Sequence, residues 1–379
     1  MTTKLNVLIL GASYGSLLAT KILLAGHDAS LVCTQGTADL IGLNGTRVRF
    51  PVKGLDHLVE VDSRQLKGQL RALTPQQVRP GDFDLVCLAM QEPQYGAQGI
   101  RELMHSIAAQ KLPCLSIMNM PPLPYLQRMG QLSVQKLTEC YQDPEVWSGF
   151  DPRFVTLCSP DPQAFRPNPQ EPHVLQVGLA TNFKAACLDD EASNAILFQL
   201  EHDIAQAKWL DMSQGVSQEL DLPVKLKVHR SIYVPLAKWC MLMTGNYRCV
   251  LPQVVCSIQN AVHQDLALSK SIYEWVEDIC FKLGAAPADL VPFEKYALAT
   301  QSLLKPSSVA RSLAAGAVDV ERLDRLVQLI AQELGLDPSP ATHTVNSVNG
   351  WLERNKAAHL KASQAALVVK GPNASLAQA

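Results

Sequence analysis

The chain has 379 residues, of which 47% are hydrophobic and 18% are charged, and its formal net charge is -2. This length exceeds what one hydrophobic core usually supports, so two domains are expected, and the composition is that of a globular protein. The near-neutral charge argues against a nucleic-acid partner, and no apolar run reaches the roughly 18 residues of a membrane span, so neither partner is predicted.

Residues 1–188 alternate between strand-like and helix-like segments. The early strand candidates are nearly continuous apolar runs, which is typical of strands buried on both faces of a parallel sheet. The sequence therefore predicts an α/β domain of the Rossmann type over residues 1–188. Strands are predicted at 6–10, 29–33, 85–90, 114–118, 154–158 and 174–179, and helices at 16–25, 37–43 and 96–110.

A glycine-containing turn lies between the first predicted strand and the first predicted helix. In a dinucleotide-binding turn, the first glycine permits the turn, the second lets the backbone approach the pyrophosphate, and the third packs helix on strand. Gly11 occupies the first position, Ser13 and Ser16 occupy the second and third, and Gly15 comes one residue early. The motif is degenerate, and a plain strand–helix turn is the alternative. Its position nevertheless predicts a cofactor site formed by Gly11, Ala12, Ser13, Tyr14, Gly15 and Ser16.

The end of the second predicted strand bears on the choice of cofactor. NAD sites usually place an acid there for the ribose hydroxyls, whereas NADP sites place a basic residue nearby. The strand ends with Val32, Cys33, Thr34 and Gln35, without an acid or an adjacent arginine. Nothing there repels a 2′-phosphate, and Thr34 and Gln35 can hydrogen-bond one. NADP (as NADPH) is therefore favoured over NAD.

From residue 189 onward the pattern becomes helical. Residues 189–209 form an amphipathic segment opened by Asp189 and Asp190, which suits a helix N-terminus. The sequence predicts a helical domain over 189–370 and a loose tail over 371–379. A short strand is predicted at 223–228, and helices are predicted near 230–250, 262–283, 287–303, 309–316, 319–334 and 339–357.

Lys238 is the only charged residue in the apolar run from Tyr233 to Asn246. Lysine is rarely buried without a partner, so the side chain either extends to the surface or faces a cleft. In a cleft it can polarise a carbonyl or protonate an alkoxide. Asn246 follows eight residues later, about 2.2 turns along a regular α-helix, and falls near the same face.

Ten cysteines are spread along the chain. None forms a Cys-x-x-Cys pair, and no close Cys/His group has zinc-site spacing, so no metal is predicted. Most lie inside apolar runs, as Cys87 and Cys158 do. They are interpreted as small core residues of a protein in a reducing cytoplasm.

Taken together, these features resemble the ketopantoate reductase family (2-dehydropantoate 2-reductases) over most of the chain. The resemblance implies an N-terminal Rossmann-type domain followed by an all-helical C-terminal domain. It also implies reduction of a 2-oxo acid to a 2-hydroxy acid with NADPH, in the cleft between the two domains. A homodimer through the helical domain is a further implication.

The resemblance assigns roles to individual residues. Lys238 matches the family lysine that polarises the ketone and supplies the proton. Asn119, after the predicted strand at 114–118, matches an asparagine that lines the cofactor and substrate cleft. Glu321 is an alternative to Asp319 as the acidic substrate contact. The implied catalytic residues are Lys238 and Asn119, the substrate contacts are Asn246, Ser307, Ser308 and Asp319, and the cofactor contacts beyond the glycine turn are Thr34, Gln91 and Asn119.

The chain also departs from the family pattern. Leu242 stands where the family has a substrate-binding asparagine, and Gln91 stands where it has a lysine. Met120 replaces a glycine, and Thr34 replaces the arginine that meets the 2′-phosphate. The segments at 60–80 and 127–172 are longer than the family norm, and the second is either a functional loop or a surface insertion. These changes predict a retained fold with an altered substrate site.

The sequence thus predicts a cytoplasmic, NADP-dependent reductase of a small-molecule 2-oxo acid. An opine-type dehydrogenase shares the domain plan but uses a His/Asp pair, and the candidate histidines lack an adjacent acid in a recognisable motif. A non-catalytic NADP-binding sensor, which keeps the fold after losing the chemistry, is the alternative from another class. The candidate histidines are His202, His229, His263 and His343.

Overall fold

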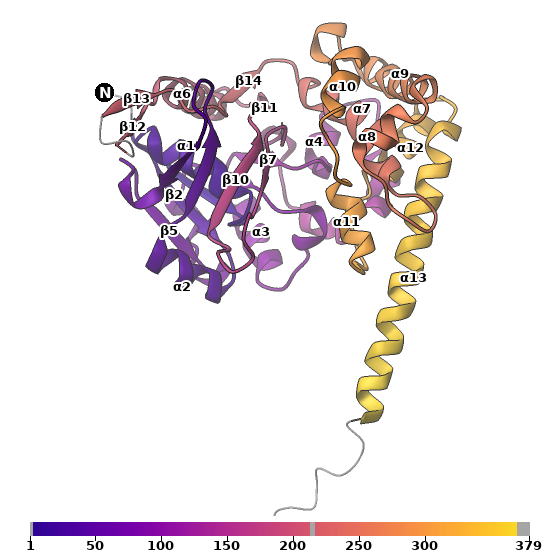
Figure 1. The fold of residues 1–379 in the computed structure, drawn as a ribbon, viewed down its shortest axis with the longest axis horizontal. Coiled ribbons are helices and arrows are strands. Elements are labelled where there is room, and N and C mark those ends of the chain that lie inside the picture. The colour runs from indigo at the N-terminus through magenta and orange to yellow at the C-terminus, as the bar shows by residue number, and fades with distance from the viewer. Residues whose placement is uncertain (1–2, 213–216, 370–379) are drawn as a thin grey trace, which may run out of the picture. The chain divides into compact units, whose positions relative to one another are not determined.

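The computed structural model describes residues 3–212 and 217–369, and the tail expected at 371–379 lies outside these residues. The chain forms two compact units (Figure 1). One consists of Met1–Lys238 with Cys280–Leu290, and the other of Trp239–Ile279 with Val291–Ala379. The first contains the main sheet and the second is helical, so the predicted fold class is confirmed.

The first unit is built around an eight-stranded sheet. Six consecutive strands pair in parallel, and most of their residues are buried, as their continuous apolar runs indicate. The remaining two strands are parallel to each other, and both run antiparallel to the six, because one of the two pairs antiparallel with the last of the six. In order across the sheet the strands are β14 (Leu226–His229), β11 (Phe183–Ala186), β8 (Val155–Ser159), β7 (Cys114–Ile117), β6 (Leu85–Leu88), β1 (Asn6–Leu10), β2 (Asp28–Val32) and β5 (Leu70–Leu73).

Helix α1 (Gly15–Leu24) follows β1 and contacts both β1 and β2. All ten of its residues are buried, because α6 (Glu191–Gln206) and β3 (Arg47–Pro51) also pack against it. This burial explains why the segment is apolar on every side rather than amphipathic. The other two helices predicted in this half are present as α2 (Gln35–Asn44) and α3 (Ile100–Ala109).

The first unit extends beyond residue 188, where the sequence suggested a boundary. Helix α6 packs against α1 and β14, and β14 pairs with β11 at the end of the sheet. The segments predicted at 189–209 and 223–228 therefore complete the Rossmann-type unit rather than open the helical one. The compact unit ends at Lys238.

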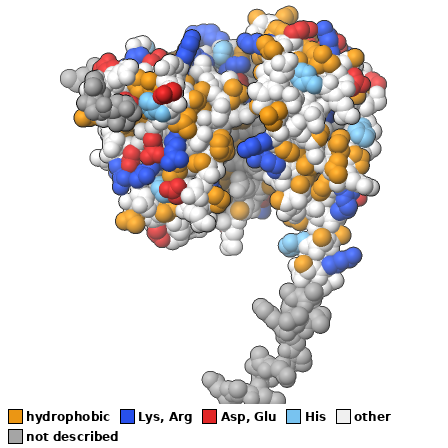
Figure 2. All heavy atoms as spheres, viewed as in Figure 1, with side chains coloured by type: hydrophobic (Ala, Val, Ile, Leu, Met, Phe, Trp, Pro, Cys, Tyr) orange, Lys and Arg blue, Asp and Glu red, His pale blue; other side chains and the backbone are white. Residues whose placement is uncertain are grey.

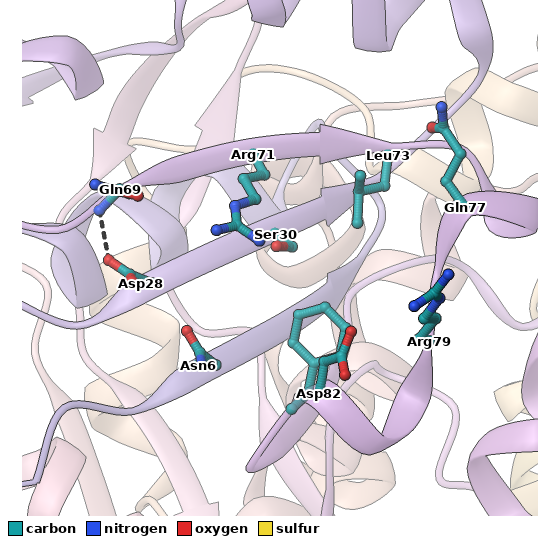
Figure 3. Close-up of a pocket in the computed structure, with 10 residues that line it drawn as sticks. Asn6, Asp28, Ser30, Gln69, Arg71, Leu73, Gln77, Arg79 and Asp82 are labelled. Carbon is teal, nitrogen blue, oxygen red and sulfur yellow. Dashed lines mark hydrogen bonds between the residues drawn. The ribbon is translucent and has the colours of Figure 1, made fainter.

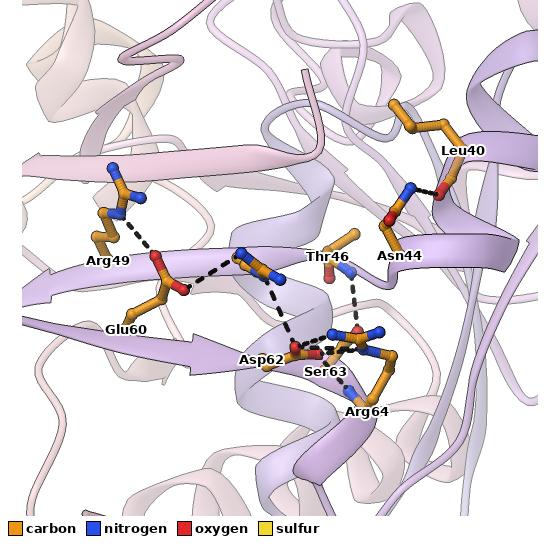
Figure 4. Close-up of polar contacts among 9 residues, drawn as sticks. Leu40, Asn44, Thr46, Arg49, Glu60, Asp62, Ser63 and Arg64 are labelled. Atoms are coloured by element: carbon orange, nitrogen blue, oxygen red, sulfur yellow. Dashed lines mark hydrogen bonds and ion pairs between the residues drawn. The ribbon is translucent and has the colours of Figure 1, made fainter. Parts of the chain in front are cut away.

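A second sheet in the first unit contains β10 (Val174–Leu179), which the sequence placed among the parallel strands. Its order is β4 (Leu58–Asp62), β3, β10 and β9 (Gln163–Phe165). The antiparallel pair β3–β4 carries charges of opposite sign at opposed positions. Arg49 donates to Glu60 at 2.8 Å (Figure 4), and Arg47 Nε lies 3.7 Å from the opposed Asp62 carboxylate. Alternation of charged and apolar residues makes these strands half-exposed.

The second unit is formed by helices in its described residues, apart from a β-bridge between Val250 and Val255. Its helices are α8 (Ile258–His263), α9 (Leu266–Leu283), which continues into the first unit, α10 (Phe293–Thr300), α11 (Ser308–Ala314), α12 (Leu323–Glu333) and α13 (Ser339–Val369). Helix α12 contacts α13, α11 also contacts α13, and α10 contacts α8. Helices α9, α11 and α12 begin and end within four residues of the predicted ranges. Helix α8 was not predicted, α10 is shorter than predicted, and α13 continues to Val369, beyond the predicted end at 357.

All ten cysteines are free thiols, and all except Cys33 and Cys256 are buried. Burial raises the pKa of the Cys87 thiol well above its ordinary value, so this thiol stays protonated. Among residues 3–212 and 217–369, no helix combines the length and apolar composition that a bilayer span requires. On the face of the first unit in Figure 2, basic and acidic side chains lie next to one another.

Lys21 is a charged residue in the fully buried helix α1, and its side chain is only 1% exposed. Its Nζ donates hydrogen bonds to the carbonyl oxygens of Leu222 and Pro223, each at 3.1 Å. The next residue, Val224, has a left-handed φ of +66°, which is strained for a β-branched side chain. Lys21 therefore fixes a strained segment against α1. Burial, together with the positive charge of the nearby Lys225, lowers the pKa of Lys21 to about 7.

This pKa predicts how stability depends on pH. Between about pH 7 and the ordinary lysine value of 10.5 the unfolded chain binds the proton and the folded chain does not, so stability rises with pH in this window. From pH 7 to about pH 8.5 the Lys21 contribution to the unfolding free energy should increase by roughly 1–2 kcal/mol. The Lys21 contribution is the difference between the unfolding free energies of the wild type and Lys21→Met, measured by denaturation at each pH. A difference that does not change with pH would contradict the assignment.

Candidate functional site

The parallel strands bring several sequence-predicted residues to one edge of the main sheet. The chain runs from β1 outward to β2 and β5, then returns to β6 on the other side of β1. Ligands of open α/β sheets bind outside the carboxyl ends of the strands at such a reversal. Gly11 follows β1, Gln91 follows β6, Asn119 follows β7 and Asp161 follows β8. Three of these four were predicted, and Asp161 was not.

The two glycines of the turn are held by close contacts. Gly11 donates its N–H to the Val32 carbonyl at 3.0 Å and has a φ of +106°. A Cβ there would lie 2.7 Å from the Ala89 carbonyl oxygen. At Gly15 a Cβ would lie 2.6 Å from Cγ2 of Ile9 on β1. Gly15 therefore performs the helix-packing role that the motif assigned to position 16.

The turn fits the pyrophosphate of a dinucleotide. It leads directly into α1, whose N-terminus carries the positive end of the helix dipole. Within the described part of the chain, the amides of Ser13 and Tyr14 have no hydrogen-bond partner, and Ser13 is exposed. Ser16 is turned inward instead, where its hydroxyl donates to the Ser13 carbonyl at 2.8 Å. Ser13 and Ser16 therefore leave the backbone N–H groups of Ser13 and Tyr14 available as hydrogen-bond donors, and the serine side chains do not fill the space within the turn.

Tyr14 connects this turn to the segment after β8. Its hydroxyl donates to the Pro162 carbonyl at 2.6 Å, and its ring meets Phe183 edge-on at 5.9 Å between centroids. Burial, with the nearby Cys158 and Asp161, raises the pKa of Tyr14 well above its ordinary value. Its phenol is therefore protonated at neutral pH and acts as a hydrogen-bond donor.

Lys238 forms a buried ion pair with Asp161. Lys238 Nζ lies 3.3 Å from Asp161 Oδ1, and the two side chains are 17% and 12% exposed. Lys184 Nζ lies 3.3 Å from the other carboxylate oxygen, and the Ser159 hydroxyl donates to Oδ1 at 2.5 Å. Burial alone would raise the pKa of Asp161, but Lys238, Lys184 and Ser159 lower it below its ordinary value. Asp161 is therefore negatively charged at neutral pH.

Lys238 is largely buried and paired with Asp161, so its side chain does not extend along the surface. The alternative expectation, that Lys238 faces a cleft, stays a prediction. Asp161, the ion-pair partner of Lys238, lies two positions after the end of β8. A charged residue directly after a buried strand of a parallel sheet is the signal that could have identified it, because ligand sites form at that edge.

Asn119 and Gln91 follow two neighbouring strands of the main sheet, β7 and β6. Asn119 is partly exposed two residues after β7, and Gln91 is exposed. The Gln91 amide donates to the side chain of Gln94 at 3.0 Å. The adjacent Glu92 is only 2% exposed and accepts the Gln142 amide at 3.1 Å. The segment 127–172 thus contacts and stabilises the loop that follows β6.

That long segment is part of the core rather than a surface loop. Trp147 is 2% exposed and packs against Tyr95 at 5.4 Å and Phe150 at 5.9 Å between ring centroids. The Tyr141 hydroxyl donates to the Pro121 carbonyl at 2.5 Å, close to Asn119 in the sequence. The turn that carries Trp147, Pro144–Trp147, contacts α3 and α4 (Leu123–Gln127), whereas Phe165 of the same segment is 43% exposed.

The polar side chains after β2 contact α2. The Thr34 hydroxyl donates to Thr37 at 3.1 Å, and Gln35 donates to the Asp39 carboxylate at 2.6 Å. Thr34 and Gln35 are exposed. No arginine or acid occupies the strand end itself, as the sequence indicated.

The second unit brings two of the four implied substrate contacts together. The Ser307 hydroxyl donates to the Asn246 carbonyl at 2.6 Å and accepts the Ala310 amide at 3.3 Å, which caps α11. Ser308 is exposed at the start of that helix. Asp319 instead pairs with Lys356 at 3.6 Å. The Glu321 carbonyl accepts the Tyr247 hydroxyl at 2.7 Å, which ties Glu321 to the Asn246 turn.

The helix predicted near 230–250 is not regular. A 3-10 turn precedes α7 (Ala237–Met241), and a π turn, Leu242–Asn246, follows it. The estimate of 2.2 turns between Lys238 and Asn246 therefore does not apply, since a π turn uses more residues. Leu242 is 2% exposed, so the residue that replaces the expected asparagine belongs to the core.

One hollow in the first unit is separate from these residues. It measures about 260 Å³ and is lined by polar side chains of β1, β2, β5 and the turns after β5 (Figure 3). Asp28 within it accepts the Gln69 amide at 2.7 Å and pairs with Lys4 at 2.7 Å. None of the predicted site residues lines this hollow.

The main sheet, its strand order and the helical second unit define a Rossmann-type fold with a helical second unit. No family model matches the sequence, and no curated protein shows detectable sequence similarity to it. Solved structures nevertheless match nearly the whole chain. The ternary structure of D-mandelate dehydrogenase with NADH and anilino(oxo)acetate is 13% identical, with a TM-score of 0.59 over 93% of this chain and 99% of that one.

Ketopantoate reductases give equivalent matches. The 2-dehydropantoate 2-reductase of Methylococcus capsulatus is 13% identical, with a TM-score of 0.59 over 94% of this chain and 97% of that one. The dimeric ketopantoate reductase of Staphylococcus aureus is 10% identical, with a TM-score of 0.58 over 93% and 100%. At these identities the likeness establishes the shared fold, so the predicted resemblance is confirmed at that level.

Proposed function

We propose that this protein is an NADPH-dependent reductase that converts a 2-oxo acid to a 2-hydroxy acid. The observation that carries the proposal is the Lys238 ammonium group, held by Asp161 beside the strand ends that bear the glycine turn and Asn119. The neighbours in fold named as ketopantoate reductase and D-mandelate dehydrogenase support this class of chemistry. A homodimer and a cytoplasmic location remain predictions.

Residues 11–16 would hold the pyrophosphate of the cofactor, which supplies hydride to the carbonyl carbon when bound. Lys238 Nζ stabilises the negative charge that develops on the carbonyl oxygen and donates a proton to it. The product is a hydroxyl group, and the neutral amine regains its proton from water. Asp161 remains a carboxylate throughout, because its pKa is lowered.

Other chain groups serve orientation in this proposal. Asn119 offers a partly exposed amide at the same sheet edge. Asn246 and Ser308 remain proposed substrate contacts, whereas the Ser307 hydroxyl already makes two hydrogen bonds. Similarly, the carboxylate of Asp319, another proposed substrate contact, already forms an ion pair with Lys356. The buried Leu242 removes one polar contact, which favours a substrate other than ketopantoate.

An opine-type His/Asp mechanism has less support. His27 lies 3.1 Å from Asp203, but it immediately precedes β2 and so lies at the opposite edge of the sheet from Gly11. His263, one of the candidate histidines, contacts the Ala297 carbonyl and the Thr300 hydroxyl at 3.0 and 3.1 Å. These contacts are structural in character.

The proposed function is tested by cofactor binding and turnover together. NADPH should bind the purified protein, and its absorbance should fall when a suitable 2-oxo acid is added. The panel should include ketopantoate, an aromatic 2-oxo acid and short aliphatic ones. Tight NADPH binding without turnover of any substrate would favour the sensor instead, and lack of binding would remove both.

The cofactor preference should be modest. We expect NADPH to bind more tightly than NADH, but within roughly tenfold, because neither an acid nor an arginine stands at the end of β2. Replacing Thr34 with arginine should strengthen NADPH binding by about tenfold or more and leave NADH binding nearly unchanged. Titrations of both cofactors against both proteins measure this. A wild-type preference for NADH would overturn the NADP assignment.

A further inference from the structure

The segment Ser159-Pro160-Asp161-Pro162, here termed the Asp161 loop, is rigid by composition. Each proline fixes its own φ and restricts the residue before it to extended backbone. Both Ser159 and Asp161 precede a proline, so the backbone on either side of the carboxylate has few conformations. The Ser159 hydroxyl and the Lys184 ammonium further fix the carboxylate from within the loop and from β11.

The Asp161 loop is also fastened to the cofactor turn. Tyr14, in the middle of that turn, donates its hydroxyl to the Pro162 carbonyl. The loop thus contacts residue 14 at one end and Lys238 through its carboxylate. All these residues belong to the first unit.

The charges around this loop make the carboxylate necessary for the lysine. Two ammonium groups, Lys184 and Lys238, lie 3.3 Å from its two oxygens. Without the carboxylate they would face each other in a largely buried site, where like charges repel strongly. The other titratable neighbours of Asp161 are Tyr14 and Cys158, both protonated because burial raises their pKa values.

We propose that Asp161 is a positioning residue, which holds the Lys238 ammonium group at the sheet edge and links it to the cofactor-binding turn. The effect of this positioning on catalysis rests on the proposed function. A rigid support for a reacting group matters because a misplacement of about 1 Å can reduce turnover about a hundredfold.

Asp161→Asn tests the proposal, since it keeps the shape and removes the charge. Competitive acetylation of Lys238, followed by peptide mass spectrometry in the protein without cofactor, should show faster labelling than in the wild type, because the ammonium group loses its counter-charge. Turnover should fall about 10- to 100-fold, and its alkaline limb should move to lower pH, since Lys238 must be protonated to donate. Unchanged Lys238 labelling in Asp161→Asn overturns the proposal.

Two further variants guard against misfolding of Asp161→Asn. Lys184→Met removes the competing ammonium group without changing any residue of the loop, so Lys238 should become harder to acetylate. Unchanged labelling counts against the coupling. Asp221→Asn is the matched control, because Asp221 also contacts two lysines, Lys225 at 2.7 Å and Lys208 at 3.5 Å, at an exposed position. It should alter neither Lys238 labelling nor turnover.

The labelling and turnover readings separate the two claims. A labelling shift in a protein that reduces no 2-oxo acid would support the coupling and defeat the proposed function. A protein that reduces 2-oxo acids with an alkaline limb that does not move in Asp161→Asn would retain its function and lose this inference.

Discussion

Replacing Lys238 with alanine should reduce turnover of the preferred 2-oxo acid by about 100- to 10,000-fold while leaving NADPH affinity within a few-fold of wild type. The ammonium group is the proposed source of both the proton and the positive charge beside the developing oxyanion. The proposed pyrophosphate contacts come from the glycine turn instead, through backbone groups that the substitution does not alter. Steady-state kinetics and a NADPH binding titration measure the two effects separately.

A second lysine in the first unit provides the control for this result. Lys227 on β14 makes only a loose contact with Glu201, at 3.9 Å, and is 45% exposed. Lys227→Ala should leave both turnover and binding unchanged, since exposed ion pairs contribute little. If Lys238→Ala retained wild-type turnover, another residue would have to supply the proton and the site assignment would be wrong.

Loss of Lys238 also changes the charge balance around Asp161. Lys184 would remain as its ammonium partner, so the carboxylate would not be left unpaired. The folded protein should therefore tolerate the substitution better than the removal of a lone partner from a buried pair. Thermal unfolding of Lys238→Ala should be close to wild type, which separates a catalytic defect from a folding defect.

Most strands of the main sheet could be predicted because they are buried on both faces, whereas β5 and β11 were not predicted. Continuous apolar runs such as Asn6–Leu10 and Cys114–Ile117 identify strands of this kind without any tertiary information. The β3–β4 pair was missed because its residues alternate between apolar and charged over only five positions each. Half-exposed strands are defined by cross-strand partners, such as Arg49 and Glu60, that lie far apart in the sequence.

The extent of the first compact unit likewise depends on contacts between distant parts of the chain. Helix α6 looks like the start of a helical domain, since nothing in its own sequence shows that it packs on α1. Strand β14 joins the sheet through pairing with β11, more than forty positions earlier in the chain. The local sequence pattern identified these elements correctly, whereas the compact unit to which each element belongs depends on long-range contacts.

At the site, residue types were predictable and partners were not. Lys238 stood out as a lone charge, but its carboxylate lies on a different strand end, at Asp161. Ser307 looked like a substrate contact from its position, although its hydroxyl caps α11. Gly15 was one position away from the expected motif, and only the contact with Ile9 reveals its role.

Gly11→Ala should lower the free energy of unfolding by about 2–5 kcal/mol and weaken NADPH binding about tenfold or more. Its φ of +106° is costly for any residue with a Cβ, and the added carbon would meet the Ala89 carbonyl oxygen at 2.7 Å. That oxygen belongs to the backbone after β6 and cannot rotate away. The turn must therefore move from the sheet edge, and with it the amides proposed to hold the pyrophosphate.

Gly26→Ala separates the two causes of this loss. Gly26 has a similar φ of +95°, but a Cβ there would meet nothing within 4 Å. It should cost only the backbone strain, about 1–2 kcal/mol, and leave NADPH binding unchanged. Chemical denaturation and NADPH titration should be carried out on both variants. Gly26→Ala reports backbone strain alone, and Gly11→Ala reports backbone strain together with the clash between the added Cβ and the Ala89 carbonyl oxygen. Equal losses of stability in the two variants would mean that contact with β6 does not constrain the turn, and equal losses of NADPH affinity would place the cofactor away from Gly11.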